Sequence, residues 1–364
     1  NDLVAATFGR GFYVLDNYTP LRSISKGLLD KKAHLFEIKE ALLYVPATPL
    51  GSKGTGSQGH SLWSAKNPSF GATFSLYLNE VESSLKSKRQ KKEKELEKDG
   101  EDVFYPSFEE IRAEDMEGKA VLIWQIFDAS GHEIRRMKST PKKGIQRQNW
   151  DLRTNATDPV GSGGQGFLVT PGDYSVRVTH VKDGKIEVLI DNQKFSVRGL
   201  NNQTLVASNT EELKSFRAEM SELNRKVSGT EKVMRETKER IDLIEKAILN
   251  YPNTDMKLLE IIRRSKLTYK DLEVKMWGDQ AKSSRDFETE PSISGRLGMV
   301  GYQLYQNTTG VTNTHRKNKS ISEKQYNELK TVLNQVINDL DSVEKKLEGI
   351  IPYTKGKGAD WKKD

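Results

Sequence analysis

The spacing of hydrophobic positions divides the chain into a β-rich part and a helical part. Between residues 70 and 198, apolar and polar residues alternate in short runs separated by turn sequences. Alternation with a period of two is typical of half-buried strands. About seven such runs predict an immunoglobulin-like or fibronectin-like β-sandwich over residues 70–200. Trp124 and Trp150 lie in these runs, and we expect them in the sandwich core rather than as sugar-binding platforms.

After residue 205 the hydrophobic spacing changes to three and four residues, which predicts helices. Eleven positions of the first helix follow this spacing, and nine of them are apolar: Leu213, Phe216, Met220, Leu223, Val227, Thr230, Met234, Thr237, Ile241, Ile244 and Ile248. Pro252 ends that helix, a second continues to Gly278, a shorter one covers residues 293–305, and the last runs over residues 322–350. We expect a C-terminal antiparallel helical bundle over residues 208–350, with intermolecular coiled-coil pairing as the alternative.

The first sixteen residues predict a β-hairpin around the turn Phe8-Gly9-Arg10-Gly11. A single hairpin is marginally stable in water, so we expect partner strands from sequence upstream of the chain. A signal peptide is expected upstream as well, because none is present here. Residues 49–69 are rich in Gly and Ser but lack the Gly-Lys-Ser/Thr ending of a phosphate-binding loop, so we interpret them as a linker.

A highly charged insertion at about residues 82–117 interrupts the sandwich pattern. Its Lys and Glu residues stand three and four apart, which favours a solvent-exposed helix, and a second helix is expected to start after Pro106. The alternative is a docking surface for an acidic partner or for phosphate headgroups. The candidate interaction residues are Lys86, Lys88, Arg89, Lys91 and Lys92.

The sequence offers little catalytic chemistry. It has no cysteine, which excludes disulfides and thiolate sites, and no Gly-x-Ser-x-Gly motif. The five histidines are not spaced as metal ligands, so each of them, His315 included, is expected at a turn or on the surface. Asp16, Asp128 and Asp151 follow strand patterns and are interpreted as turn residues. We therefore predict no catalytic residue, no metal and no cofactor.

Charge changes this picture only slightly. The formal net charge is +7, but 58 basic residues are interspersed with 51 acidic ones, and no nucleic-acid recognition fold accompanies them. Nucleic-acid binding is therefore not expected. No apolar run is long enough to predict a transmembrane segment. Residues 351–364 form a basic tail.

The order of motifs resembles that of bacterial sortilin-like, BNR-repeat β-propeller proteins, which are sometimes labelled glycosyl hydrolases. The opening Asn1-Asp2-Leu3-Val4-Ala5-Ala6-Thr7-Phe8-Gly9-Arg10-Gly11-Phe12-Tyr13-Val14-Leu15-Asp16 is similar to their final propeller blade, as is the following Thr19-Pro20-Leu21-Arg22. Asn149-Trp150-Asp151-Leu152-Arg153 and Pro171-Gly172-Asp173-Tyr174 resemble motifs of their sandwich domain. The resemblance implies that residues 1–48 are the last propeller strands and a connector. The Asp-box pattern is absent from this chain, so no active-site residue of the family maps onto it.

This resemblance implies an exported protein of the periplasm, the cell surface or the medium. The function we expect is that of a non-catalytic extracytoplasmic scaffold or binding protein whose partner is a protein, a peptide or a glycan. Two alternatives stay open: a sialidase-like glycoside hydrolase with its active site mostly in upstream blades, and a subunit of a cell-envelope or outer-membrane assembly that associates with a membrane-bound complex.

Overall fold

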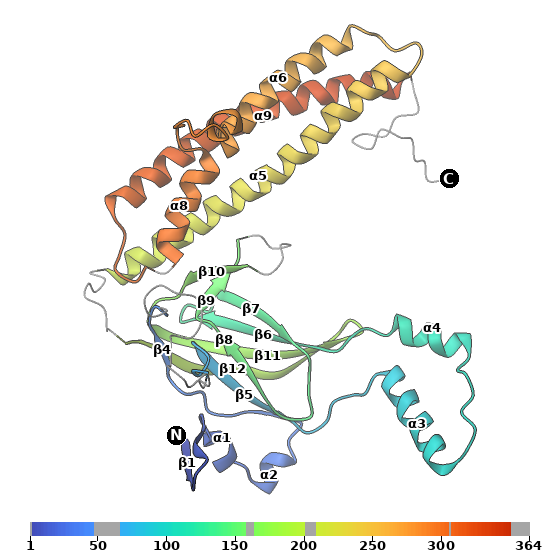
Figure 1. The fold of residues 1–364 in the computed structure, drawn as a ribbon, viewed down its shortest axis with the longest axis vertical. Coiled ribbons are helices and arrows are strands. Elements are labelled where there is room, and N and C mark those ends of the chain that lie inside the picture. The colour runs from blue at the N-terminus through green and yellow to red at the C-terminus, as the bar shows by residue number, and fades with distance from the viewer. Residues whose placement is uncertain (1, 47–65, 158–163, 201–208, 306, 351–364) are drawn as a thin grey trace. The chain divides into compact units, whose positions relative to one another are not determined.

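The computed structural model describes residues 2–46, 66–157, 164–200, 209–305 and 307–350 (Figure 1). These residues form two compact units, one built from β-sheets and one from helices. The prediction of β-sheets followed by a helical C-terminal region is thereby confirmed. His60, the basic tail and most of the predicted linker lie outside the described residues.

The β unit contains a five-stranded and a three-stranded sheet. The five-stranded sheet has the order β4 (Ala41–Leu43), β12 (Lys185–Gly199), β11 (Gly172–Lys182), β6 (Val121–Asp128) and β7 (Glu133–Ser139). The three-stranded sheet has the order β3 (Ala33–Leu35), β5 (Ala72–Leu78) and β8 (Gly144–Trp150). Their described pairings are antiparallel except for β12 with β4, which run parallel. The short strands β3 and β4, from the expected connector, thus belong to the same sheets as the strands after residue 70.

One apolar core joins the two sheets, and the two tryptophans lie at its centre. Trp124 and Trp150 have no exposed surface, which confirms them as core residues. Each indole N–H has a partner: Trp124 Nε1 donates to Ser139 Oγ at 2.8 Å, and Trp150 Nε1 donates to the Arg153 carbonyl at 2.9 Å. Because a buried indole N–H without an acceptor is costly, these two bonds help to fix the orientation of both rings.

The described part of the β unit also contains a separate hairpin and four helices. The strands β1 (Leu3–Thr7) and β2 (Gly11–Leu15) form the predicted hairpin as a sheet of their own. They are followed by α1 (Thr19–Arg22) and α2 (Lys26–Leu29). The helices α3 (Leu85–Asp99) and α4 (Phe108–Met116) occupy the charged insertion between β5 and β6. The strands β9 (Arg153–Asn155) and β10 (Gln165–Leu168) form a two-stranded sheet, and residues 156–167 are grouped with the helical unit.

The helical unit contains α5 (Thr210–Asn250), α6 (Leu258–Trp277), α7 (Gln280–Ser283), α8 (Ile293–Tyr305) and α9 (Asn313–Glu348). The long helices α5, α6 and α9 lie side by side in Figure 1. Ten of the eleven predicted positions on α5 are buried, and Thr230 is half-buried. Burying each apolar side chain of such a stripe contributes roughly 1.5–3 kcal/mol, so the packed stripe accounts for helices of this length.

The last helix begins at Asn313, earlier than the expected start near residue 322. Thr312 accepts a hydrogen bond from the backbone N–H of His315, and His315 Nδ1 accepts one from the backbone N–H of Thr312. This reciprocal arrangement is a capping box in which histidine takes the place of the usual Glu or Gln. The surface prediction for His315 is therefore wrong: its side chain is buried, because the cap turns the ring inward against Phe216.

Candidate interaction surface

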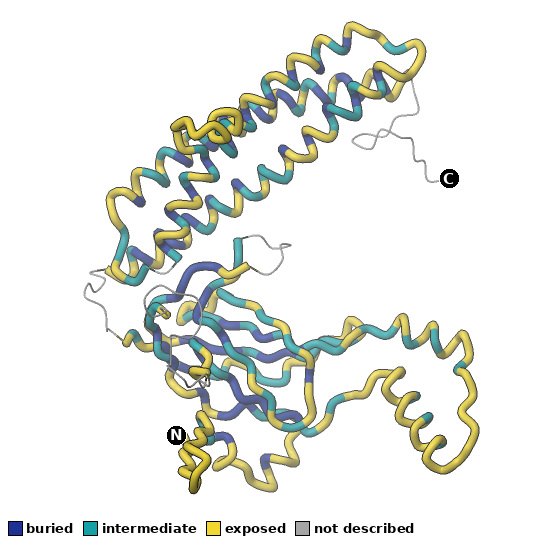
Figure 2. The backbone as a smooth tube through the Cα atoms, in the orientation of Figure 1, coloured by how far each residue is buried: buried dark blue, intermediate teal, exposed yellow. Residues whose placement is uncertain are grey.

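The five candidate residues Lys86, Lys88, Arg89, Lys91 and Lys92 all lie on α3. This helix packs beside α4, and we call residues 84–117 the arm. No residue of either helix is buried, and Figure 2 shows both helices mainly in the colours of exposed and intermediate residues. The expectation of an exposed charged helix is confirmed.

Local sequence explains where the helices of the arm begin and end. Ser84 caps α3 by accepting a hydrogen bond from the Ser87 backbone N–H at 3.1 Å. Gly100 ends α3 in the left-handed conformation, with φ of 76°. Ser107 and Glu110 form a capping box at the start of α4, and these bonds hold the pKa of Glu110 below its ordinary value. The arm is therefore a defined helical hairpin.

Arg89 joins the two helices of the arm. Its Nε lies 2.6 Å from Glu114 Oε1, and its Nη1 lies 2.5 Å from Glu93 Oε1. These hydrogen bonds, with Glu114 first, raise the pKa of Arg89 above its ordinary value, and the bond from Arg89 lowers the pKa of Glu114. Arg89 thus holds the arm together and is only partly exposed, whereas the sequence grouped it with the interaction residues.

A second set of charges joins the arm to the β unit. Lys182 of β11 lies 2.9 Å from Glu117 and 3.1 Å from Glu82. The Glu117 carboxylate also accepts a hydrogen bond from the Leu85 backbone N–H at 2.7 Å. The bond from Lys182, and then the one from Leu85, lower the pKa of Glu117. Residues 85 and 117 therefore meet at the base of the arm, and its tip lies between α3 and α4.

The four lysines are all exposed on the first half of α3. Lys91 lies 3.9 Å from Glu95, a solvent-exposed pair that contributes little to stability. Lys86, Lys88 and Lys92 project from a helix that buries no residue. Their ammonium groups are available to a negatively charged surface.

Sequence reasoning missed a group of exposed apolar side chains in the arm. Phe104, Tyr105 and Phe108 are 82%, 83% and 85% exposed, and Met116 is 78% exposed. Large exposed apolar side chains are typical of interaction sites. The sequence signal for this exposed group was the aromatic segment Phe104-Tyr105, which belongs to no predicted strand or helix.

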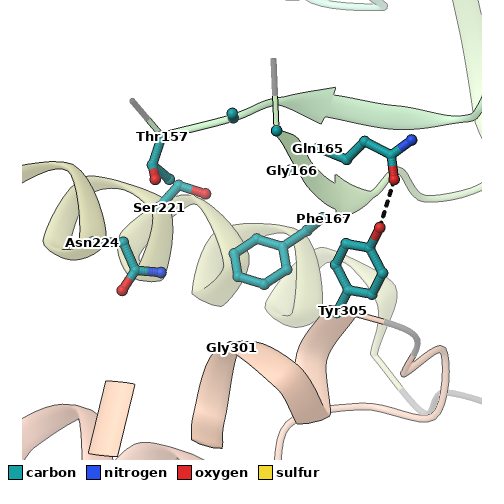
Figure 3. Close-up of a pocket in the computed structure, with 10 residues that line it drawn as sticks. Thr157, Gln165, Gly166, Phe167, Ser221, Asn224, Gly301 and Tyr305 are labelled. Atoms are coloured by element: carbon teal, nitrogen blue, oxygen red, sulfur yellow. Dashed lines mark hydrogen bonds between the residues drawn. The ribbon is translucent and has the colours of Figure 1, made fainter. Parts of the chain in front are cut away.

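The helical unit has a pocket of about 430 Å³ (Figure 3). Phe167 enters the helix core beside it, and the Tyr305 hydroxyl donates to Gln165 Oε1 at 2.6 Å. The lining consists of small, polar or aromatic residues: Ala156, Thr157, Gly164, Gln165, Gly166, Phe167, Ser221, Asn224, Gly301 and Tyr305. None of these described lining residues is a carboxylate, a lysine or a histidine.

Two of the carboxylates considered in the sequence, Asp128 and Asp151, accept hydrogen bonds from nearby backbone N–H groups. Asp128 accepts hydrogen bonds from the backbone N–H groups of Ser130 and His132, which is the turn role that was predicted. Asp151 accepts from the backbone N–H of Arg153 and lies 3.6 Å from Arg135. Among the described residues there is no group of three or more side chains that could hold a metal ion. None of the helices in the described part of the chain combines the length and apolar character needed to span a membrane.

No family model matches the chain, and no curated protein matches it.

Proposed function

We propose that this chain is the C-terminal part of a sortilin-like, BNR-repeat β-propeller protein of the extracytoplasmic space, and that it serves as a non-catalytic scaffold or binding protein. In this proposal, β1 and β2 close the last propeller blade. The two sheets form an immunoglobulin-like sandwich and the four longer C-terminal helices form an antiparallel bundle. Both then act as spacer and docking elements for a protein, peptide or glycan partner.

The observation that supports this proposal is the apolar surface of the hairpin. Every described residue of β1 and β2 is exposed, and neighbouring positions such as Tyr13 and Val14 point to opposite faces of the hairpin. A two-stranded sheet with apolar residues on both faces is marginal in water, and further strands beside it would cover them. A propeller blade supplies such strands.

The position of the hairpin supports the same proposal. Arg147 of β8 donates through Nη2 to the carbonyls of Asp16 and Asn17, at 3.0 and 2.8 Å. The Asp2 carboxylate accepts from the Asn17 backbone N–H at 2.8 Å, and this bond lowers the pKa of Asp2. These three hydrogen bonds fix the end of the hairpin and leave its apolar faces open to other strands.

The chain has no cysteine, so a single introduced cysteine can report on the hairpin. We expect Phe12→Cys to react rapidly with a maleimide in the 364-residue chain and to be protected in the longer protein that carries the upstream blades. Tyr302→Cys on α8 is the matched control, because Tyr302 is 83% exposed, and it should react in both. Equal reactivity of Phe12→Cys in the two proteins would contradict the propeller assignment.

The non-catalytic role requires a separate test. The longer protein should bind one class of partner without converting it when presented with arrays of peptides and glycans. Turnover of a glycan that is abolished by one Asp or Glu substitution would overturn the scaffold proposal and favour a glycoside hydrolase.

A further inference from the structure

The charges of the arm are separated along its length. Residues 85–92 contain five basic side chains and no acidic one. Residues 95–110 contain seven acidic side chains and one basic one. Because residues 85 and 117 meet at the base, the basic stretch lies near the base and the acidic stretch reaches the tip.

The exposed apolar residues of the arm are separated in the same way. Phe104, Tyr105 and Phe108 lie at the tip, between the end of α3 and the start of α4. Leu85, at the start of α3, and Met116, at the end of α4, lie at the base and are 42% and 78% exposed. Each end of the arm therefore combines exposed apolar side chains with an excess of one sign of charge. At the base the basic residues outnumber Glu114, Asp115 and Glu117, and two of these carboxylates are already paired, Glu114 with Arg89 and Glu117 with Lys182.

Internal contacts hold this surface in place before any partner binds. Arg89 joins α3 to α4 through Glu114, the capping box of Ser107 and Glu110 fixes the start of α4, and Lys182 fixes the base. A surface that is already ordered loses less conformational entropy on binding.

We propose that the arm is a self-association surface, through which two copies of the chain pair with their arms side by side in opposite directions. The acidic tip of each arm then lies on Lys86, Lys88, Lys91 and Lys92 of the other copy. The aromatic side chains at the tip cover Leu85 and Met116 of the other copy. Such an arrangement is isologous, because each end of one arm meets the opposite end of the other around a two-fold axis.

A second copy explains more of the surface than a foreign partner does. A basic protein would complement the tip and leave the lysines without a role, and an acidic protein would do the reverse. The arm itself carries both complements, each beside exposed apolar residues. This inference goes beyond the proposed function and does not depend on it.

The size of the arm sets the expected strength of the pairing. The 15 residues of α3 extend over about 22 Å, so two arms side by side bury an area at the low end of specific interfaces. We therefore expect a dimer that forms reversibly and weakens as salt rises, because exposed charges separated by more than about 10 Å are screened at 0.1 M salt.

The test is sedimentation velocity of the 364-residue chain over a range of concentrations at low salt, with complementary charge reversals. One variant reverses the base (K88E/K91E/K92E) and the other reverses the tip (E101K/D102K/E109K). Each variant alone should raise the dissociation constant of the dimer at least about tenfold, because the attraction between tip and base is lost at both contacts of its homodimer. An equimolar mixture should recover dimer, because the unchanged tip of one variant then meets the unchanged base of the other.

The matched control reverses three exposed lysines on α9 (K324E/K330E/K345E), which changes net charge by the same amount as the base variant. It should dimerise like the unchanged chain. A third variant, F104S/Y105S/F108S, should weaken the dimer without altering the far-UV circular dichroism spectrum. An unchanged chain that stays monomeric at every concentration would overturn the proposal. So would a mixture of the two reversed variants that stays monomeric, even if each binds an added basic or acidic protein.

Discussion

Arg240 of α5 and Glu344 of α9 form an ion pair inside the helical unit. Arg240 Nη2 lies 2.5 Å from Glu344 Oε2 and 2.6 Å from Asp341 Oδ1. The Glu344 side chain is 1% exposed, so the ion pair with Arg240 is shielded from solvent. The pair joins the two longest described helices at one register. Removing one partner of a buried ion pair strongly destabilises the folded state.

We expect Arg240→Leu to lower the free energy of unfolding by about 3–5 kcal/mol, because it takes the guanidinium group away from the buried Glu344 carboxylate. The double variant R240L/E344L should recover most of that loss, since two apolar side chains replace the pair. Urea denaturation measures both values. The control is Arg264→Leu, which removes the exposed pair of Arg264 with Asp339 and should cost at most about 1 kcal/mol. Equal losses in Arg240→Leu and Arg264→Leu would contradict a structural role for the buried pair.

His315 makes the stability of the helical unit depend on pH. Burial, and then the charge of Arg316, lower the pKa of His315 below its ordinary value. Nδ1 accepts from the Thr312 backbone N–H, so the folded chain holds the neutral ring. An unfolded histidine takes up a proton near pH 6.5, where the folded one does not. The unfolded state then binds more protons, so this contribution is complete above about pH 6.5 and is lost as the pH falls below it.

Unfolding measured between pH 5 and pH 8 should therefore show a steeper loss on the acidic side for the unchanged chain than for His315→Gln. Glutamine is a common residue at this position of a capping box, so the variant keeps an acceptor without a titrating ring. His132→Gln is the control, because that side chain is 81% exposed. An identical pH dependence in the unchanged chain and in His315→Gln would refute the assignment.

Short-range patterns in the sequence predicted the helices well. The buried face of α5 was predicted from the spacing of its apolar residues alone. Residues three and four apart share one face of a helix, whichever element packs against that face. The charged helix α3 followed from its lysine and glutamate pairs in the same way. Whether that helix binds a partner could not be decided from composition.

Contacts between residues far apart in the chain could not be predicted from the sequence. The pairing of β4 with β12 joins Leu43 to Gly199, and no local pattern specifies such a partner. Arg89 looked like one more basic residue, and its role became visible only when Glu114, 25 positions away, was found beside it. The burial of His315 was missed because its motif, Thr-x-x-His, departs from the usual capping box.

Gly71 is the glycine whose replacement should be most damaging. A Cβ at this position would lie 1.9 Å from the Trp150 carbonyl oxygen, and the backbone has φ of 113°. We expect Gly71→Ala to prevent β5 and β8 from pairing at this end and to cost more than about 3 kcal/mol. Gly131→Ala, with φ of 79° and no atom within 4 Å of its Cβ, is the control and carries only the backbone strain. The difference in unfolding free energy between the two variants, measured by thermal unfolding, gives the cost of the clash with the Trp150 carbonyl. Equal unfolding free energies would contradict the close approach of Gly71 to Trp150.

Phe167 belongs to the core of the helical unit although it lies in the strand β10. Its ring is 7% exposed and packs with the residues of that core, next to the pocket in Figure 3. Phe167→Ala should lower the free energy of unfolding of the helical unit by about 3–5 kcal/mol, because the vacated volume can collapse only in part. Phe8→Ala removes a fully exposed ring and should leave that value unchanged. Urea unfolding followed by the circular dichroism signal of the helices distinguishes the two. A loss below about 1 kcal/mol for Phe167→Ala would mean that the ring rests on the helices without contributing to their core.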